Sequence, residues 1–218
     1  QVRRNGKDKV LVSQTAYVSN ITVRALQRGI NRDTNLDARG ITEYLSCTGE
    51  CQFLASHSRP DISSDISLAQ RQKPTYHDLA AMYEILSYVK NTESNGIVIK
   101  SIPLDETTII VAYGDSGWAN APPLKTQTCC LIAITTAEAR VKTVPTSYAD
   151  HQSQRTNRTV RSTLAAEAIA ADNDTYVAAY LSEVILGLFI RDVFISFKYA
   201  SNQKINIKIE SRHHSFVF

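Results

Sequence analysis

Three acidic residues occupy positions from which they could do chemistry. Asp115 follows an apolar run at residues 109–113, and Glu167 falls within the first turns of an expected helix. Glu210 follows an alternating run at residues 204–209. Converging carboxylates repel one another unless cations lie between them, so a cluster of the three would imply a divalent metal, most naturally Mg²⁺. Two such ions about 4 Å apart would activate water and stabilise the leaving oxygen of a phosphodiester.

Each candidate also has an ordinary explanation. An Asp in a Tyr-Gly-Asp-Ser-Gly stretch is typical of a turn, and a Glu early in a helix complements the helix dipole. Cys47 and Cys51 could lie one helical turn apart, but no second ligand pair with zinc spacing accompanies them, which favours buried thiols. His213 and His214 could bind a metal, although terminal exposure is the simpler interpretation.

The first hundred residues favour helices, which are predicted at residues 42–53, 61–72 and 76–89. The third helix has an apolar stripe with spacings of three and four, which is typical of an amphipathic helix. This stripe consists of Leu79, Met82, Tyr83, Leu86 and Val89. An Asn-Gly turn at residues 95–96 follows it.

Beyond Gly96 the composition changes to β-branched residues, which favour strands. Strands are predicted at residues 96–102, 107–113, 128–134 and 141–148, and the last three suggest an antiparallel meander. A domain boundary is expected near residues 102–106. The predicted domains are therefore residues 1–103 and residues 104–218.

A long helix is predicted beyond Arg161, with Ser162 or Thr163 as its N-cap and a possible break near residues 172–173. A last strand is predicted at residues 204–209. If this strand returns parallel to the first strand of the meander, their ends lie side by side, where α/β sheets place their sites. The predicted fold class is mixed α/β.

The net charge of +3 and the isoelectric point of about 8.6 allow a polyanionic partner without requiring one. Basic residues gather within the first ten positions and again at residues 155–161, where they could meet phosphates or be solvated surface. The most apolar stretch, residues 184–197, contains Arg191 and Asp192 and is too short to span a bilayer. With no secretory signal pattern, we expect a soluble intracellular protein, cytoplasmic or nuclear, with reduced thiols.

Several segments of the first domain resemble copia-type retrotransposon reverse transcriptases. The run Ser58-Arg-Pro-Asp-Ile62, preceded by Thr42-Glu-Tyr-Leu-Ser46 and Phe53-Leu54, resembles the helical segment after the polymerase palm. Residues 74–79 and 85–92 resemble the next helix, and residues 12–17 an earlier segment. The resemblance implies that residues 1–103 form a thumb-like or connection-like segment, with the polymerase aspartates upstream of Gln1.

The second domain resembles the ribonuclease H domain of the same polyproteins. Tyr113-Gly-Asp-Ser-Gly-Trp-Ala-Asn120 resembles its first strand and turn, and Ser162-Thr-Leu-Ala-Ala-Glu167 its helix motif. Ile207-Lys-Ile-Glu-Ser211 stands in place of the third motif, with Glu210 where the family has Asp. The resemblance implies that Asp115, Glu167 and Glu210 are the catalytic, metal-binding residues for Mg²⁺ or Mn²⁺. The implied substrate is the RNA strand of an RNA–DNA hybrid.

This sequence also departs from the family pattern. Glu210 is longer than Asp, a fourth carboxylate has no room before Phe218, and Cys129 and His151 replace a usual glycine and aromatic residue. These departures favour a truncated domain whose hydrolase activity is weak or lost. The alternatives are a non-catalytic nucleic-acid-binding remnant and an inert piece of a decayed element. Expected partners are an RNA–DNA hybrid or other nucleic acid and the rest of the polyprotein, and no membrane.

Overall fold

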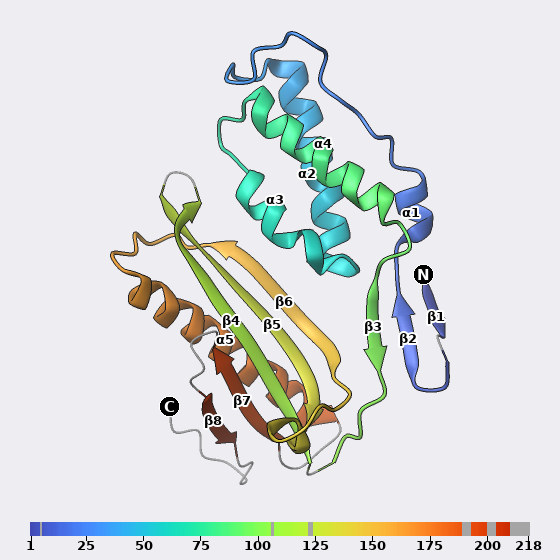
Figure 1. Cartoon of the computed structure of the whole chain (residues 1–218), viewed down its shortest axis with the longest axis vertical. Coiled ribbons are helices and arrows are strands. Elements are labelled where there is room, and N and C mark those ends of the chain that lie inside the picture. Colours follow the sequence, from blue (N-terminus) through green and yellow to red (C-terminus); the bar gives the residue numbers. More distant parts are fainter. Residues whose placement is uncertain (5, 106, 122–123, 189–192, 200–203, 210–218) are drawn as a thin grey trace. The chain divides into compact units, whose positions relative to one another are not determined.

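A computed structural model describes the backbone of residues 1–209, apart from residues 5, 106, 122–123, 189–192 and 200–203, and side chains as far as Ile185. The chain divides into two compact units, each described by itself. Unit 1 comprises Gln1–Val98 with Ser153–Arg155, and unit 2 comprises the rest of the chain from Ile99. Both contain helices and strands, so the fold is mixed α/β (Figure 1). No helix in the described part of the chain is long and apolar enough to cross a membrane.

Unit 1 is mainly helical, as predicted. Its helices are α1 (Thr15–Ser19), α2 (Ala38–His57), α3 (Ser63–Ala69) and α4 (Tyr76–Asn91), with a short 3-10 turn, η1 (Pro60–Ile62), before α3. They follow an antiparallel hairpin of β1 (Val2–Arg4) and β2 (Lys9–Val12), which the sequence did not predict. β3 (Ile97–Lys100) joins this hairpin in the order β1-β2-β3.

Side-chain caps explain where the long helices of unit 1 begin. The backbone N–H of Gly40 donates to Asp37 Oδ1 at 2.7 Å, so Asp37 caps α2. At the start of α4, Thr75 and Asp78 form a capping box, in which the backbone N–H of Thr75 donates to Asp78 Oδ2 at 2.8 Å. These bonds satisfy N–H groups that have no partner within the helix.

The core of unit 1 lies among α2, α3 and α4. The whole apolar stripe predicted for α4 is buried in it, which confirms the amphipathic interpretation. Cys47 and Cys51 of α2 are free, fully buried thiols in the same core. The interpretation of these cysteines as buried thiols is therefore confirmed.

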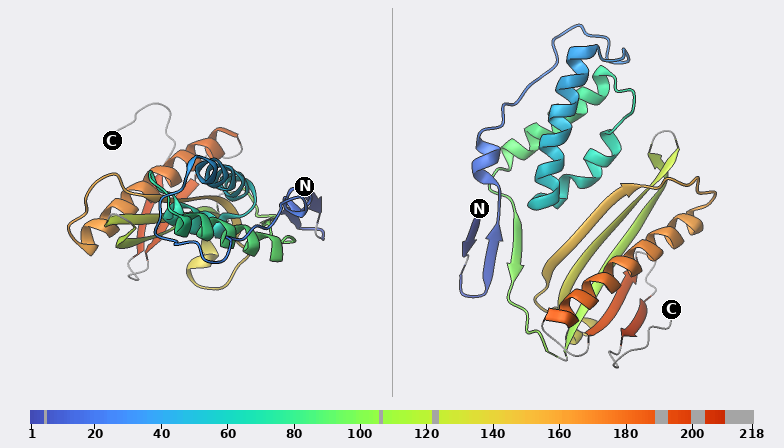
Figure 2. Two further views of the ribbon diagram at one scale, coloured as in Figure 1. Left: turned by 90° about the horizontal axis from the view of Figure 1, so that it is seen from above. Right: turned by 180° about the vertical axis from the view of Figure 1, so that it is seen from behind.

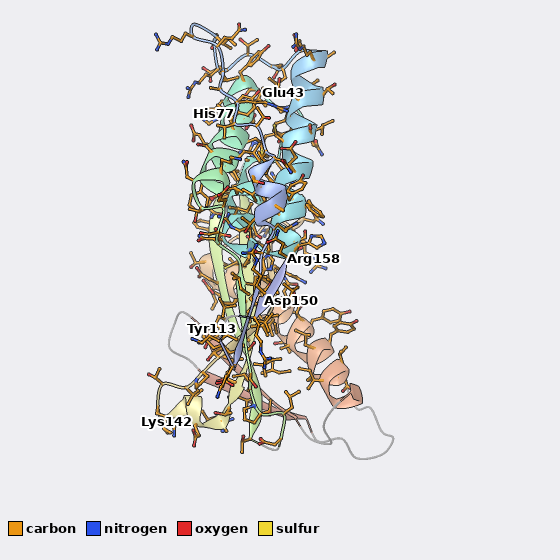
Figure 3. The ribbon with its side chains drawn as sticks, turned by 90° about the vertical axis from the view of Figure 1, so that its right-hand side faces the viewer. Glu43, His77, Tyr113, Lys142, Asp150 and Arg158 are labelled. Carbon is orange, nitrogen blue, oxygen red and sulfur yellow. The ribbon has the colours of Figure 1, made fainter. Side chains whose placement is uncertain are left out.

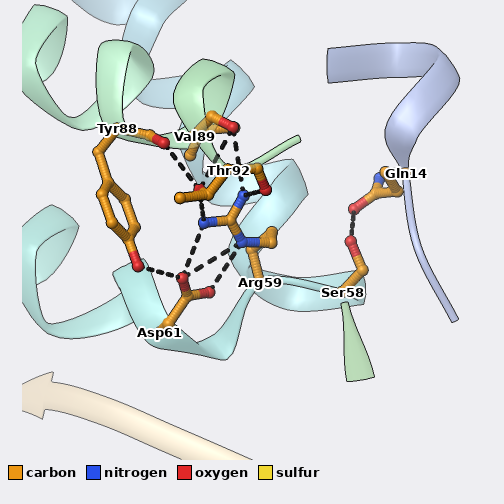
Figure 4. A network of polar contacts seen from close by, with 7 residues as sticks. All are labelled: Gln14, Ser58, Arg59, Asp61, Tyr88, Val89 and Thr92. Carbon is orange, nitrogen blue, oxygen red and sulfur yellow. Dashed lines mark hydrogen bonds and ion pairs between the residues drawn. The ribbon is translucent and has the colours of Figure 1, made fainter. Parts of the chain in front are cut away.

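Arg59, between α2 and η1, is only 1% exposed and is held by a network of polar contacts (Figure 4). Its Nη2 donates to Asp61 Oδ2 and to Thr92 Oγ1, each at 2.8 Å. Its Nη1 donates to the carbonyl oxygens of Val89 and Thr92 at 3.4 and 3.2 Å. The guanidinium carbon also lies over the Tyr88 ring, 5.4 Å from its centroid. Arg59 thus joins η1 to the C-terminal end of α4, where it adds donors to the carbonyl oxygens of Val89 and Thr92.

Unit 2 is a five-stranded sheet with a long helix, α5 (Thr163–Leu188), across one face (Figure 2). The strands are β4 (Thr108–Ala121), β5 (Lys125–Thr136), β6 (Ser147–Arg155), β7 (Val193–Tyr199) and β8 (Lys204–Ile209). Their order is β6-β5-β4-β7-β8, which makes β4 the central strand. β4 runs antiparallel to β5 and parallel to β7.

The even-numbered residues of β4 face α5. Ile110 and Ala112 are buried in one cluster with Val177 and Ala178 of the helix. Side chains alternate between the two faces of a strand. Positions 114 and 116 therefore also face α5, and position 115 faces the opposite side.

Three predictions for this unit need correction. The strand at residues 204–209 exists as β8, but it pairs antiparallel with β7 at the sheet edge and does not adjoin β4. The parallel neighbour of β4 is β7, in a register that pairs Gly114 with Tyr199. The strand expected at residues 141–148 begins later, at Ser147. α5 is continuous through residues 172–173, where a break was considered possible.

Candidate metal centre

Glu167 of α5 reaches the central strand beside Asp115. The Ser116 hydroxyl donates to Glu167 Oε1 at 3.0 Å, on the α5 face of β4. Asp115 is exposed and belongs to the opposite face, which it shares with Tyr113, labelled in Figure 3. The two predicted carboxylates therefore flank one segment of β4 from its two sides.

Contacts before the helix position Glu167. Trp118 Nε1, near the end of β4, donates to the carbonyl oxygen of Val160 at 2.9 Å. The backbone N–H of Ala165 then donates to Ser162 Oγ at 3.1 Å. Ser162 is thus the N-cap, one of the two alternatives predicted, and the capped turn places Glu167 one turn into α5.

The charges of three carboxylates affect the pKa of the Cys129 thiol. Cys129 is the partner of Asp115 on β5, and its Sγ donates to the Asp115 carbonyl oxygen at 3.7 Å. Burial raises the pKa of this thiol, and the charges of Asp115, Asp174 and Glu167 raise it further against the lowering effect of the carbonyl bond. The charges of all three acidic groups thus act on the same thiol.

Asp174 is a further acidic residue of α5, beyond the three carboxylates predicted as ligands from the sequence. It is 1% exposed, and neither of its carboxylate oxygens has a hydrogen-bond partner among the described residues. Burial raises its pKa to about 6, the Cys130 thiol offsets part of this rise, and the charge of Glu167 adds to it. Its Oδ2 lies against Gly114, where an added Cβ would overlap it. A buried, unpaired carboxylate is unfavourable, so a proton or a cation must compensate it.

Cys130 is the polar side chain that β5 presents toward Asp174. Burial raises the pKa of its thiol, as do the interaction with Asp174 and the charge of Asp150 on β6, labelled in Figure 3. The thiol therefore stays protonated at neutral pH. It is a weak donor and not an activated nucleophile.

The feature of the sequence that points to Asp174 is its spacing from Glu167 within α5. Glu167 and Asp174 are seven residues apart, which is two helical turns and places both on one face. Gly114, directly before Asp115, is the residue on the strand that leaves room for the second carboxylate. Neither feature identifies a site unless it is also known that α5 packs on β4.

Glu210, the third predicted carboxylate, lies outside the described residues, as do His213 and His214. Among the residues that are described, no three His, Cys, Asp or Glu side chains are close enough to hold one ion. What the fold gathers on the α5 face is a pair of carboxylates, Glu167 and Asp174, with the Ser116 hydroxyl beside the first. Oxygen donors of this kind suit a hard divalent cation such as Mg²⁺.

The close packing of Gly114 on Asp174 leads to a testable prediction. Gly114→Ala is expected to lower the free energy of unfolding of unit 2 by about 2 kcal/mol, because the new methyl group overlaps the Asp174 carboxylate. Urea unfolding followed by the fluorescence of Trp118, the single tryptophan, measures this.

A double-variant cycle separates this overlap from a general effect of alanine. In an Asp174→Ala background the further loss caused by Gly114→Ala should fall below about 0.5 kcal/mol, because the overlapping group is gone. Equal penalties for Gly114→Ala with and without the Asp174 carboxylate would contradict the contact.

The fold and this site define a mixed α/β protein whose central strand is flanked by acidic side chains. Over 80 residues the chain is 36% identical to the "Retrovirus-related Pol polyprotein from transposon RE1" of Arabidopsis thaliana. The match covers 36% of this chain and 5% of that polyprotein, so the chain corresponds to a small part of its relative. The similarity supports a relationship to a retrotransposon Pol polyprotein. No family model matches the chain, and no solved structure matches it.

Proposed function

We propose that the chain is a segment of a copia-type retrotransposon Pol polyprotein whose second half is a ribonuclease H-like domain. Residues 1–103 would be the thumb-like or connection-like end of a reverse transcriptase, and residues 104–218 would act on the RNA strand of RNA–DNA hybrids. The bond between Ser116 and Glu167 carries the proposal, because it joins the acidic helix to the strand segment of Asp115. The partners would be nucleic acid and the rest of the polyprotein.

In this proposal Asp115 and Glu167 would be ligands of Mg²⁺ or Mn²⁺, with Glu210 as the third ligand expected from the sequence. Because Asp115 lies on the face of β4 opposite Glu167, the two side chains do not converge on one ion, which favours weak or lost activity. The metal would supply activated water and stabilise charge on the leaving oxygen of the phosphodiester. The protein's own contribution is positional. Ser116 orients Glu167, and the contact from Trp118 to Val160 fixes the start of α5. Recognition of the hybrid would depend on backbone shape and the RNA 2′-hydroxyl group.

The sheet order supports weak or lost activity. β7 is the strand beside β4, whereas Glu210 follows the edge strand β8. The four residues that follow β7 in the sequence are Ala-Ser-Asn-Gln, which include no carboxylate. A third ligand from the neighbouring strand is therefore absent from this part of the sequence, and metal-assisted hydrolysis depends on accurate ligand placement.

Hybrid cleavage by the full chain tests the proposal. We expect slow, Mn²⁺-dependent or Mg²⁺-dependent cleavage of the RNA strand, reduced about tenfold or more by Asp115→Asn and by Glu167→Gln. Asp172→Asn is the matched control, because Asp172 is an exposed acidic residue on the same helix and should leave the rate unchanged. Cleavage that persists equally in Asp115→Asn, or without divalent metal, would remove Asp115 from the mechanism.

A non-catalytic nucleic-acid-binding role is the second candidate, and the β1–β2 hairpin favours it. Arg3, Arg4, Lys7 and Lys9 of this hairpin are all exposed, so they are available to phosphates. Hybrid binding that weakens steeply with salt, without cleavage in any metal, would support this role over the first.

A further inference from the structure

The buried carboxylate of Asp174 is the group that the proposed function leaves unexplained. It faces β4 from α5, and among the described residues it has no hydrogen-bond partner beyond the weakly donating Cys130 thiol. None of the groups that shift the pKa of Asp174, Cys129 or Cys130 is positively charged. Buried charges in proteins are paired or coordinate a metal, so its surroundings lack the usual compensation.

Two carboxylates of α5 lie over neighbouring positions of one strand. Glu167 contacts Ser116, and Asp174 contacts Gly114. Positions two apart on a strand are separated by about 7 Å, and both contacts are on the same face. The charge of Glu167 also contributes to the raised pKa of Asp174.

We propose that Glu167 and Asp174 together bind a divalent cation of the Mg²⁺ class between β4 and α5. Two carboxylates completed by water are a usual ligand set for Mg²⁺, which does not require three protein groups. Asp174 would then supply, from the helix, a carboxylate ligand that the residues after β7 do not provide. This inference rests on the proposed function in that Glu167 is a ligand in both.

Gly114 is part of the same arrangement. A side chain at this position would fill the space that the Asp174 carboxylate takes against the strand. The alternative to a cation is a proton held permanently by Asp174, which would make the carboxylate a neutral core group. The two explanations differ in whether metal affinity depends on Asp174.

Mn²⁺ binding to the full chain, followed by electron paramagnetic resonance at about pH 8, distinguishes them. The wild-type chain is expected to bind Mn²⁺, and Asp174→Asn and Glu167→Gln are each expected to weaken binding about tenfold or more. Asp172→Asn, an exposed neighbour on α5, is expected to bind as the wild type does. Circular dichroism confirms that each variant is folded, and Asp174→Ala serves as the second variant if Asp174→Asn is not.

Wild-type affinity in Asp174→Asn would overturn the inference, as would a wild-type chain that binds no Mn²⁺. These outcomes are separable from the nuclease proposal. Mn²⁺ affinity that requires Asp174, in a chain that cleaves no hybrid, would keep the cation site and reject the nuclease. Cleavage that requires Asp115 and Glu167, with Mn²⁺ affinity indifferent to Asp174, would do the reverse.

Discussion

Arg59→Met is expected to lower the free energy of unfolding of unit 1 by about 3 kcal/mol. Methionine fills part of the space but removes one of the donors to each of the carbonyl oxygens of Val89 and Thr92, and the charged partner of the Asp61 carboxylate. Loss of one partner of a buried ion pair costs about 3–5 kcal/mol. The lower end applies because the Asp61 side chain is 38% exposed and water can solvate it.

Urea unfolding followed by circular dichroism of the helices measures the effect. Arg59→Lys should recover only part of the loss, because an ammonium group cannot repeat the two-sided contact of Arg59 with Asp61 and Thr92. Arg39→Met is the matched control on α2, since Arg39 is exposed and its loss should change stability by less than about 0.5 kcal/mol. A change of that small size in Arg59→Met would mean that the network contributes little.

The helical half of the fold could be predicted because its signals are local. The stripe from Leu79 to Val89 and the N-cap Ser162 depend on residues a few positions apart, and both are present where expected. The β1–β2 hairpin was missed because its strands have only three and four residues, too few to show a strand pattern.

The position of β7 beside β4 could not be predicted from the sequence. Residues 193–199 continue an apolar run from the end of α5, and a short apolar run fits a buried strand or a buried helix equally well. The alternation at residues 204–209 correctly predicted a strand. It could not indicate which neighbour that strand pairs with, because register and partner are set by tertiary packing.

Some residues of the candidate site could be predicted from the sequence and others could not. Asp115 and Glu167 could be selected because each occurs within a recognisable local stretch, and the fold joins their segments through Ser116. Asp174 could not be selected, because its significance depends on which helical position meets Gly114. A carboxylate in the middle of a helix otherwise resembles the exposed Asp172 two residues before it.

Asp174→Asn is expected to stabilise unit 2 in metal-free buffer at about pH 8, on the order of 2 kcal/mol. The folded-state pKa of Asp174 is about 6, raised from 3.8 by burial, so folding favours the protonated form. This contribution is complete below pH 3.8 and is lost as the pH rises through about 6. The neutral amide of asparagine has no such loss, so the advantage of the variant should grow with pH and disappear at about pH 3.8.

The same variant should behave oppositely when a divalent cation is present. A ligand that binds only the folded state stabilises it by RT ln(1 + [L]/Kd), so saturating Mn²⁺ should stabilise the wild-type chain by at least about 1.4 kcal/mol more than Asp174→Asn, whose affinity is expected to be about tenfold or more weaker. Urea unfolding followed by Trp118 fluorescence, with EDTA and with Mn²⁺, measures both effects in unit 2. Asp172→Asn should follow the wild type in each buffer. If the wild-type chain is more stable than Asp174→Asn in EDTA at about pH 8, a group of the protein itself must compensate the charge of the Asp174 carboxylate. If Mn²⁺ stabilises both chains equally, Asp174 is excluded as a ligand.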